Sequence, residues 1–465
     1  MATHEPTRAD NSRSRVRVEL GERSYDIRFY HDEPDALACD LAPYCPERAL
    51  IVSNPTIWNL HGEALASALT RAGVDFIVEL IGDGEEFKTL AHDLALRGFP
   101  VIVLERGDIA SGTSGRTHGL LHSGSRYCVT DGEAAVECIQ ENIILRRIAA
   151  QCIEFNEGFF VALDEEDLNY APQFVEGCRA AGIPVHPLTP QQALSVEPNL
   201  NPNLLAAYRV PDGAFDPLRL ALSFAATAKR NGAVFLTYHE VKGLILRAGG
   251  VAGVIALNRH RGQEVRLEAD LVVNATGAWA GIIAAMANIH VPVVPTPGVM
   301  VAYNRRLINR VVNRLNTPGD GDILIPQRRM VVIGTTSFET PDIDYIPVDE
   351  NQVEEMWRKA VELVPAVANA EQRGAYMSAR PLIGSGEAGR SLSRTFKSYA
   401  HRQNDGVSGF ITITGGKATT CRLMAEKAAD MVCEQLGISA VCRTAELPLD
   451  SYRTYYQSMD GDAIE

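Results

Sequence analysis

Residues 87–108 read "FKTLAHDLALRGFPVIVLERGD" and decide how the chain is interpreted. The apolar spacing over 87–97 predicts a helix that stops at Gly98, and 101–104 predicts a short buried strand that ends in Glu105. A strand closed by an acid in this way is typical of the second strand of a βαβ unit that binds a dinucleotide. The acid would then hold a ribose.

The glycine-rich turn that normally precedes such a unit is missing. A G-x-G-x-x-G turn is expected about 20 residues before the acid, near residues 83–88. The sequence there is "DGEEFK". Gly82 and Gly84 supply G-x-G, but Phe87 stands at the third glycine position, and Asp83 and Glu85 bring negative charge to the place of a pyrophosphate. We therefore expect weakened cofactor binding.

Length and composition limit the class of protein. The chain has 465 residues and a formal charge of −14, which predicts two or three domains and argues against nucleic-acid binding. No run of about 18 apolar residues predicts a membrane span. The nine cysteines form no C-x-x-C pair, which fits reduced thiols in a cytoplasmic protein. No metal site is expected.

The segment from the strand to Tyr127 carries the clearest chemical signal. Glu105 and Arg106 are placed to meet a ribose and an adenine ring. Glycines follow at 112, 115 and 119, where backbone amides can approach a pyrophosphate or a flat ring. Arg116 and Arg126 could bind anions. A solvated glycine-rich loop with incidental arginines explains the same composition equally well.

His118 and His122 are four residues apart, which is a metal-ligand spacing on a helix. The surrounding glycines argue against a helix there, so we prefer a proton-handling role, with a structural role as the alternative.

Two further segments combine a buried strand with a turn of small residues. They are "LVVNATGAW" (271–279) and "TGGKATT" (414–420). The second fails the P-loop pattern, because Ala418 follows the lysine. Its glycines precede a predicted helix and could direct amide dipoles at an electron-accepting group. Asp216 and Pro217 predict the start of a helix that runs to about Arg230.

Several motifs together resemble the FAD-dependent glycerol-3-phosphate dehydrogenases, most closely the catalytic A subunit of the anaerobic bacterial type. They include "LALRGFPVIVLERGDIASGTSGRTHGLLHSGSRYCVTD", "LVVNATGAW", "SARPLIGSGEAGRSLSR" and "GFITITGGKATTCRLMAEKAAD". The resemblance covers about 91–447. It implies an α/β flavoprotein of the D-amino-acid-oxidase type, in which a Rossmann-like FAD domain accompanies an antiparallel-sheet substrate domain.

The residues before about 90 resemble a different family. "VRVELGERSYDI", "ALIVSNPTIW" and "DGEEFKTL" are similar to the N-terminus of 3-dehydroquinate synthase and related sugar phosphate cyclases. Asp83, Glu85 and Lys88 match a stretch that binds NAD in that family, whereas its zinc ligands and catalytic residues are absent. We interpret the chain as chimeric, with the first βα unit replaced by a dehydroquinate-synthase-like αβ segment.

Combining the two resemblances divides the chain into parts. These are a disordered tail at 1–15, the cyclase-like segment at 16–90, a discontinuous FAD domain at 91–155, 205–290 and 405–440, a substrate domain at 156–204 and 291–404, and a C-terminal tail at 441–465.

The first resemblance also implies roles for individual residues. Those that would hold FAD are Glu105, Arg106, Ser111, Gly112, Ser114, Gly115, Leu120, His122, Val241, Ala275, Gly277, Gly416 and Lys417. Those that would act on the substrate are His122, Arg126, Tyr127, Arg380, Arg394 and Lys417.

The implied activity is oxidation of sn-glycerol 3-phosphate, a small phosphorylated polyol, to dihydroxyacetone phosphate by hydride transfer to flavin. Electrons would leave to a quinone, another acceptor or a partner subunit. The location would be cytoplasmic, with peripheral association at the inner face of the membrane as an option. Two alternatives stay open: an inactive chimera that binds little or no FAD, and an NAD-binding module formed by the N-terminal segment.

Overall fold

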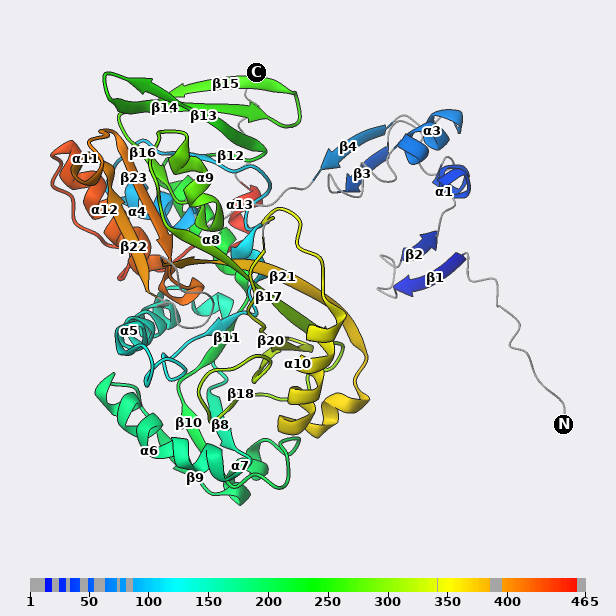
Figure 1. The fold of residues 1–465 in the computed structure, drawn as a ribbon. Coiled ribbons are helices and arrows are strands. Elements are labelled where there is room, and N and C mark those ends of the chain that lie inside the picture. The colour runs from blue at the N-terminus through cyan, green and yellow to red at the C-terminus, as the bar shows by residue number, and fades with distance from the viewer. Residues whose placement is uncertain are drawn as a thin grey trace. The chain divides into compact units, whose positions relative to one another are not determined.

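The computed structural model of the chain describes nine stretches of residues. They are 13–18, 25–30, 34–41, 49–53, 63–72, 76–80, 87–340, 342–384 and 395–457. The chain divides into two compact units, Met1–Gly82 and Asp83–Glu465 (Figure 1). The segment expected in place of the glycine turn, 83–86, lies outside the described residues.

Among its described residues, the smaller unit has two separate strand pairs and two helices. Its elements are β1 (Arg13–Val18), β2 (Tyr25–Tyr30), α1 (Pro34–Leu41), β3 (Ala49–Ser53), α3 (Glu63–Arg71) and β4 (Phe76–Leu80). β1 and β2 are antiparallel, and β3 and β4 are parallel. The alternation of strand and helix predicted for this segment is confirmed. The predicted tail at 1–15 extends too far, because β1 begins at Arg13.

Short strands and helices of four to sixteen residues form the half of the larger unit that carries the predicted nucleotide site. The elements are α4 (Phe87–Leu96), β5 (Ile102–Leu104), α8 (Pro217–Arg230), β12 (Val234–Leu236), β16 (Val272–Asn274), α9 (Ala280–Ala285), β22 (Phe396–Ala400), α11 (His401–Asn404), β23 (Phe410–Gly415) and α12 (Cys421–Leu436). β5 pairs in parallel with β12, and β16 with β23.

Helix α4 is buried on two sides because its apolar residues form two stripes. Leu90 and Leu94 pack against the core formed by β23 and α12. Ala91 and Ala95 pack against β5 and α8, where small side chains allow close approach. Gly98 ends the helix with φ +86°, in the left-handed region that favours glycine. The predicted helix, stop and strand over 87–105 are confirmed.

The start of α8 also follows the prediction. The Asp216 side chain accepts a hydrogen bond from the Arg219 N–H at 3.0 Å, and Pro217 occupies the first helical position. The carboxylate satisfies one of the amides that a helix N-terminus leaves unpaired.

A large sheet forms the other half of this unit. In spatial order its strands are β21 (Gln372–Ile383), β17 (Val293–Tyr303), β20 (Met330–Gly334), β19 (Ile323–Gln327), β18 (Val311–Arg314), β8 (Gly158–Ala162), β10 (Ala206–Val210) and β9 (His186–Leu188). Neighbouring strands are antiparallel except β18 and β8. The predicted boundaries shift slightly: β10 joins this sheet although it follows residue 204, and β22 pairs with β23 although it precedes residue 404.

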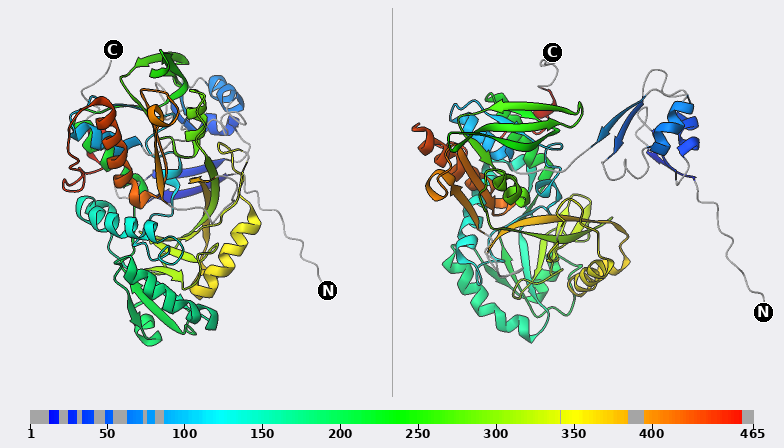
Figure 2. Two further views of the ribbon diagram at one scale, coloured as in Figure 1. Left: turned by 60° about the vertical axis from the view of Figure 1, so that its left-hand side comes forward. Right: turned by 45° about the horizontal axis from the view of Figure 1, so that its top comes forward.

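Further helices and strands complete the larger unit. They are β6 (Leu120–Leu121), α5 (Gly132–Ile148), β7 (Ile153–Glu154), α6 (Glu165–Ala180), α7 (Pro190–Val196), β11 (Gly213–Phe215), β13 (His239–Arg247), β14 (Gly250–Asn258), β15 (Gln263–Glu268), α10 (Glu350–Leu363) and α13 (Thr454–Gln457). In both views of Figure 2 the green β13–β15 sheet lies at one end of this unit, and α6 (cyan-green) and α10 (yellow) lie towards the other.

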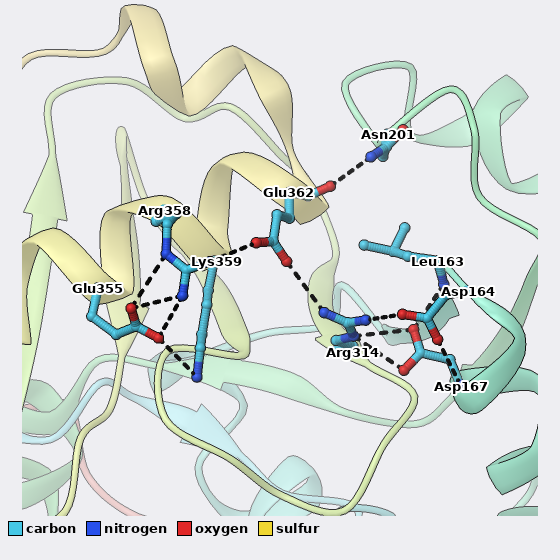
Figure 3. Close-up of polar contacts among 9 residues, drawn as sticks. All are labelled: Leu163, Asp164, Asp167, Asn201, Arg314, Glu355, Arg358, Lys359 and Glu362. Carbon is cyan, nitrogen blue, oxygen red and sulfur yellow. Dashed lines mark hydrogen bonds and ion pairs between the residues drawn. The ribbon is translucent and has the colours of Figure 1, made fainter.

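One arginine joins the helices that flank the large sheet. Arg314, the last residue of β18, donates to both carboxylate oxygens of Asp167 at 3.1 Å and to Glu362 at 3.2 Å (Figure 3). It also pairs with Asp164. These acids belong to the start of α6 and the end of α10, so the network fixes both helices to one strand.

The C-terminal segment is packed, which corrects the predicted tail at 441–465 as far as residue 457. Leu449 and Tyr455 are buried, and the Leu449 N–H donates to the Ile148 carbonyl oxygen at 2.8 Å. Within the described ranges, no helix is long and apolar enough to cross a bilayer.

Candidate functional site

The larger unit contains a cavity of about 750 Å³ between the loop at 113–131, the large sheet and the glycine turn after β23. Eight of the predicted site residues line it. They are Ser114, Leu120, His122, Arg126, Tyr127, Arg380, Gly416 and Lys417. Residues more than 300 positions apart therefore meet at one site, as the resemblance implied.

Glu105 lies directly after β5 and is 3 % exposed. Its carboxylate accepts a hydrogen bond from the Gly107 N–H at 2.8 Å. Burial raises the pKa of Glu105 to about 7, against the opposing effects of the Gly107 amide and of the positive charges of Lys88 and Arg106. A buried carboxyl of this kind is suited to pairing with the hydroxyls of a ribose.

Arg106 follows this acid in the chain, and the strand that carries Val241 begins with a hydrogen bond to it. Arg106 donates to Asp344 at 2.8 Å, and its guanidinium carbon lies 4.8 Å from the centroid of the Trp279 ring. Val241 belongs to β13, whose first residue, His239, donates its N–H to the Glu105 carbonyl oxygen at 2.8 Å. The start of β13 is thus fixed beside the strand end.

The loop from Glu105 leads to the cavity wall. The hydroxyl of Ser111 is buried, and no group among the described residues bonds to it. Gly112 precedes a short 3₁₀ turn over Thr113–Arg116. A Cβ on Gly115 would lie 1.9 Å from the Ala110 carbonyl oxygen, so only glycine fits at this position.

Three side chains form a chain of contacts on one side of the cavity. His122 is buried, and its N–H donates to Thr419 Oγ1 at 3.1 Å. Its Nε2 lies 3.5 Å from the hydroxyl oxygen of Tyr127. The ammonium nitrogen of Lys417 lies 4.9 Å from the centroid of the Tyr127 ring. Two segments that are almost 300 residues apart in the sequence therefore hold these three side chains together.

Arg126 is fixed by residues that follow β18. It forms a salt bridge with Asp322, which is 3 % exposed, and donates to the Gly319 carbonyl oxygen at 3.2 Å. Asp322 in turn accepts from the Gly319 N–H at 2.6 Å. This acid was not predicted, because it lies 196 positions from its partner and belongs to no motif.

Arg380 is fixed on β21. Its guanidinium donates to the carbonyl oxygens of Thr296 at 3.3 Å, Pro297 at 3.2 Å and Thr336 at 2.5 Å. These three backbone acceptors set the direction in which the guanidinium points. Arg394 lies outside the described residues.

The small-residue turns lie at the ends of β16 and β23. Ala275 is buried directly after β16, and the Thr414 hydroxyl donates to the Gly277 carbonyl oxygen at 3.1 Å. Gly416 has φ +72°, and a Cβ there would lie 2.5 Å from the Met424 sulfur. The two turns are thereby joined, as expected for a cradle built from both segments.

His118, for which the sequence predicts the same proton-handling role as for His122, also lines the cavity. The two ring centroids are 6.0 Å apart. No group of three His, Cys, Asp or Glu side chains that could hold a metal ion occurs within the described part of the chain.

The residues present fit an elongated flavin nucleotide. A buried acid stands where the sequence predicts a ribose-binding group. A buried hydroxyl to which none of the described residues bonds follows at Ser111, and the same loop continues into a cavity large enough for a ring system and a small substrate.

Comparison with known proteins gives a consistent result. Residues 89–422 match the family described as FAD dependent oxidoreductase. The chain is 44 % identical over 387 residues to the A subunit of anaerobic glycerol-3-phosphate dehydrogenase from Escherichia coli K12, covering 82 % of this chain and 71 % of that one. It is 44 % identical over 400 residues to the protein of the same name from Haemophilus influenzae, covering 85 % and 70 %.

Among solved structures, the fold is similar to that of a glycerol-3-phosphate dehydrogenase from Bacillus halodurans complexed with FAD. The TM-score is 0.61 and the identity 22 %, over 92 % of this chain and 73 % of that one. The predicted flavoprotein fold is confirmed.

Proposed function

Because the chain belongs to the FAD dependent oxidoreductases, among the relatives of the anaerobic glycerol-3-phosphate dehydrogenases, we propose that its cavity oxidises sn-glycerol 3-phosphate to dihydroxyacetone phosphate. One observation carries this proposal: Arg126, Arg380 and Lys417 line a single cavity in a chain whose net charge is −14. Such a cluster suits a small dianion.

The cofactor is FAD, which when bound accepts a hydride from the substrate carbon that carries the secondary hydroxyl. Glu105 would bind the ribose of FAD. The Ser111 hydroxyl would form a hydrogen bond farther along the nucleotide. Gly112, Gly115 and Gly416 would allow the backbone to approach it without an intervening Cβ.

The cationic side chains would orient the substrate through its phosphate. Arg126 is held by Asp322 and by the Gly319 carbonyl, so its guanidinium is oriented before the substrate arrives. Arg380 is oriented by three backbone carbonyls. Preoriented donors reduce the entropy that binding must overcome. The substrate hydroxyl would then lie at a defined distance from the reacting centre.

The hydroxyl proton must leave as the carbonyl forms. His122 is the candidate acceptor through Nε2, which faces the Tyr127 hydroxyl at 3.5 Å. Tyr127 would orient the ring, and the Thr419 contact to the His122 backbone would hold the segment in place.

Electron acceptor and location extend the proposal. The names of the relatives describe one chain of a larger enzyme, which supports assembly with other chains as the route by which electrons leave; a quinone is the alternative acceptor. We place the protein in the cytoplasm, with peripheral association at the inner membrane face. The free thiols of the eight described cysteines support this location.

The N-terminal segment bears on how well FAD binds. The family match begins at residue 89, within α4. Lys88, which matched an NAD-binding stretch, is buried and acts electrostatically on Glu105. We therefore assign it to the flavin site.

The decisive experiment records the visible spectrum of the purified protein before and after addition of FAD, and again with glycerol 3-phosphate or glycerol. We expect a flavin band that glycerol 3-phosphate bleaches and that glycerol at the same concentration does not. Arg126→Lys keeps the charge and should need more substrate for bleaching, and Arg126→Gln more still. Absence of flavin at saturating FAD would favour the inactive chimera, and NAD binding by that protein would favour an NAD-binding module.

A further inference from the structure

His118 has a defined place in the wall of the cavity. It follows the turn at Thr113–Arg116 and lies against β20, where a Cβ added to Gly334 would be 3.4 Å from its Cδ2 atom. Its ring stands nearly edge-on to that of His122, at an interplanar angle of 66°. The imidazole is thus positioned by backbone on one side and open to the cavity on the other.

The hydrogen bonding of His118 determines its tautomer. Nδ1 accepts the Leu120 N–H at 3.1 Å, so this nitrogen carries no proton. A neutral imidazole that accepts through Nδ1 carries its proton on Nε2 and can only donate there. Burial, together with the positive charges of Arg126 and Arg380, lowers the pKa of His118 to about 3. The ring therefore stays neutral at physiological pH.

We propose that His118 donates its Nε2–H to the phosphate of the substrate, as the neutral member of an anion site formed with Arg126 and Arg380. This inference rests on the proposed function and adds a specificity-determining residue to it.

This tautomer excludes His118 as the group that accepts the proton of the substrate's secondary hydroxyl. Oxidation of the secondary hydroxyl requires a group that accepts a proton, and His118 offers the cavity only a donor. A phosphate dianion carries oxygens that accept hydrogen bonds without giving up a proton. The positive charges of Arg126 and Arg380 disfavour a charged imidazole at this place. The same charges favour an anion there.

Two matched variants separate the anchor from the donor. His118→Asn puts its amide near the Nδ1 position, where the oxygen can accept the Leu120 N–H, but nothing reaches the Nε2 position. His118→Gln reaches the Nε2 position with an amide N–H. The readouts are the Kd of inorganic phosphate, measured by calorimetry on the FAD-loaded protein, and KM and kcat for glycerol 3-phosphate.

We expect H118N to raise the phosphate Kd and the KM about 10- to 100-fold, the effect of losing one hydrogen bond to a charged group, with kcat nearly unchanged. H118Q should lie within about 3-fold of the wild type. Equal loss in both variants, or no loss in H118N, would overturn the proposal. Thermal melting identifies a variant that fails to fold.

Nitrogen NMR of imidazole-labelled wild-type protein tests the tautomer without any variant. A protonated Nε2 and an unprotonated Nδ1 at pH 7 support the proposal, and the reverse assignment overturns it. Phosphate binding also separates this inference from the proposed function: a protein that binds phosphate through His118 but does not oxidise glycerol 3-phosphate refutes only the activity. Failure of the wild type to bind phosphate refutes the role of His118.

Discussion

His92 makes the stability of the larger unit depend on pH. It lies on α4, is completely buried beside Phe224, and neither ring nitrogen has a hydrogen-bond partner among the described residues. Burial, helped by the charge of Arg230, lowers the pKa of His92 from 6.5 to about 4. The unfolded chain therefore takes up a proton more readily between these values, and stability is lost as the pH falls from about 6.5 towards 4.

The size of the effect follows from this shift. At about 1.36 kcal/mol per pKa unit, the wild type loses about 2 kcal/mol by pH 5 and about 3 kcal/mol by pH 4 through His92 alone. At pH 7 the neutral ring already costs about 1–3 kcal/mol, because none of the described residues bonds to its buried nitrogens. We expect His92→Leu to be more stable than the wild type at pH 7, with the difference growing by about 2 kcal/mol at pH 5.

Urea denaturation followed by circular dichroism at pH 7, 6 and 5 measures this difference. His186→Leu is the matched control, because His186 lies exposed on β9 and its replacement should leave the pH profile unchanged. A difference between wild type and His92→Leu that stays constant over this range would refute the reasoning.

Three further predictions concern other parts of the larger unit. Glu141→Gln breaks a buried two-bond ion pair with Arg422 (2.6 and 2.9 Å) and should reduce the free energy of unfolding by about 3–5 kcal/mol in denaturant titrations. Gly98→Ala should cost about 1 kcal/mol by the same assay, through backbone strain alone, because a Cβ there meets nothing within 4 Å. Asp322→Asn removes the charge that holds Arg126 and should raise KM for glycerol 3-phosphate about tenfold with little change in melting temperature.

Each of these has a contrary outcome. An unchanged midpoint for Glu141→Gln would mean that Arg422 finds sufficient partners in Thr444 and Glu426, which it also contacts. Equal stability of Gly98→Ala would show that the chain can end α4 in another conformation. For Asp322→Asn, a fall in kcat at constant KM would contradict a role limited to positioning Arg126.

Local features of the fold were predictable because short-range physics determines them. The Asp216 cap, the Gly98 stop and the strand before Glu105 each depend on a few neighbouring residues, and each occurs as predicted. The packing of the C-terminal segment, which the sequence predicts as a tail, depends on long-range contacts. The burial of Tyr455 depends on α8, which is distant in sequence.

The site was predictable to the extent that motifs mark it. Arg126, Arg380 and Lys417 lie in recognisable segments and line one cavity. Asp322 carries no motif, and its importance comes from a single long-range salt bridge. The tautomer of His118 depends on one hydrogen bond from the backbone of a loop, which spacing alone does not determine.

The two stripes of α4 have a consequence for how the chain tolerates change in length. Leu90 and Leu94 serve one core, and Ala91 and Ala95 serve another. Inserting one residue between Ala91 and Leu94 would turn the following part of the helix by about 100°. Leu94 would then point at the space that an alanine fills, and a cavity would open at its former place. Substitutions ahead of Phe87 leave this phase intact. The packing therefore fixes the spacing of these four residues along α4.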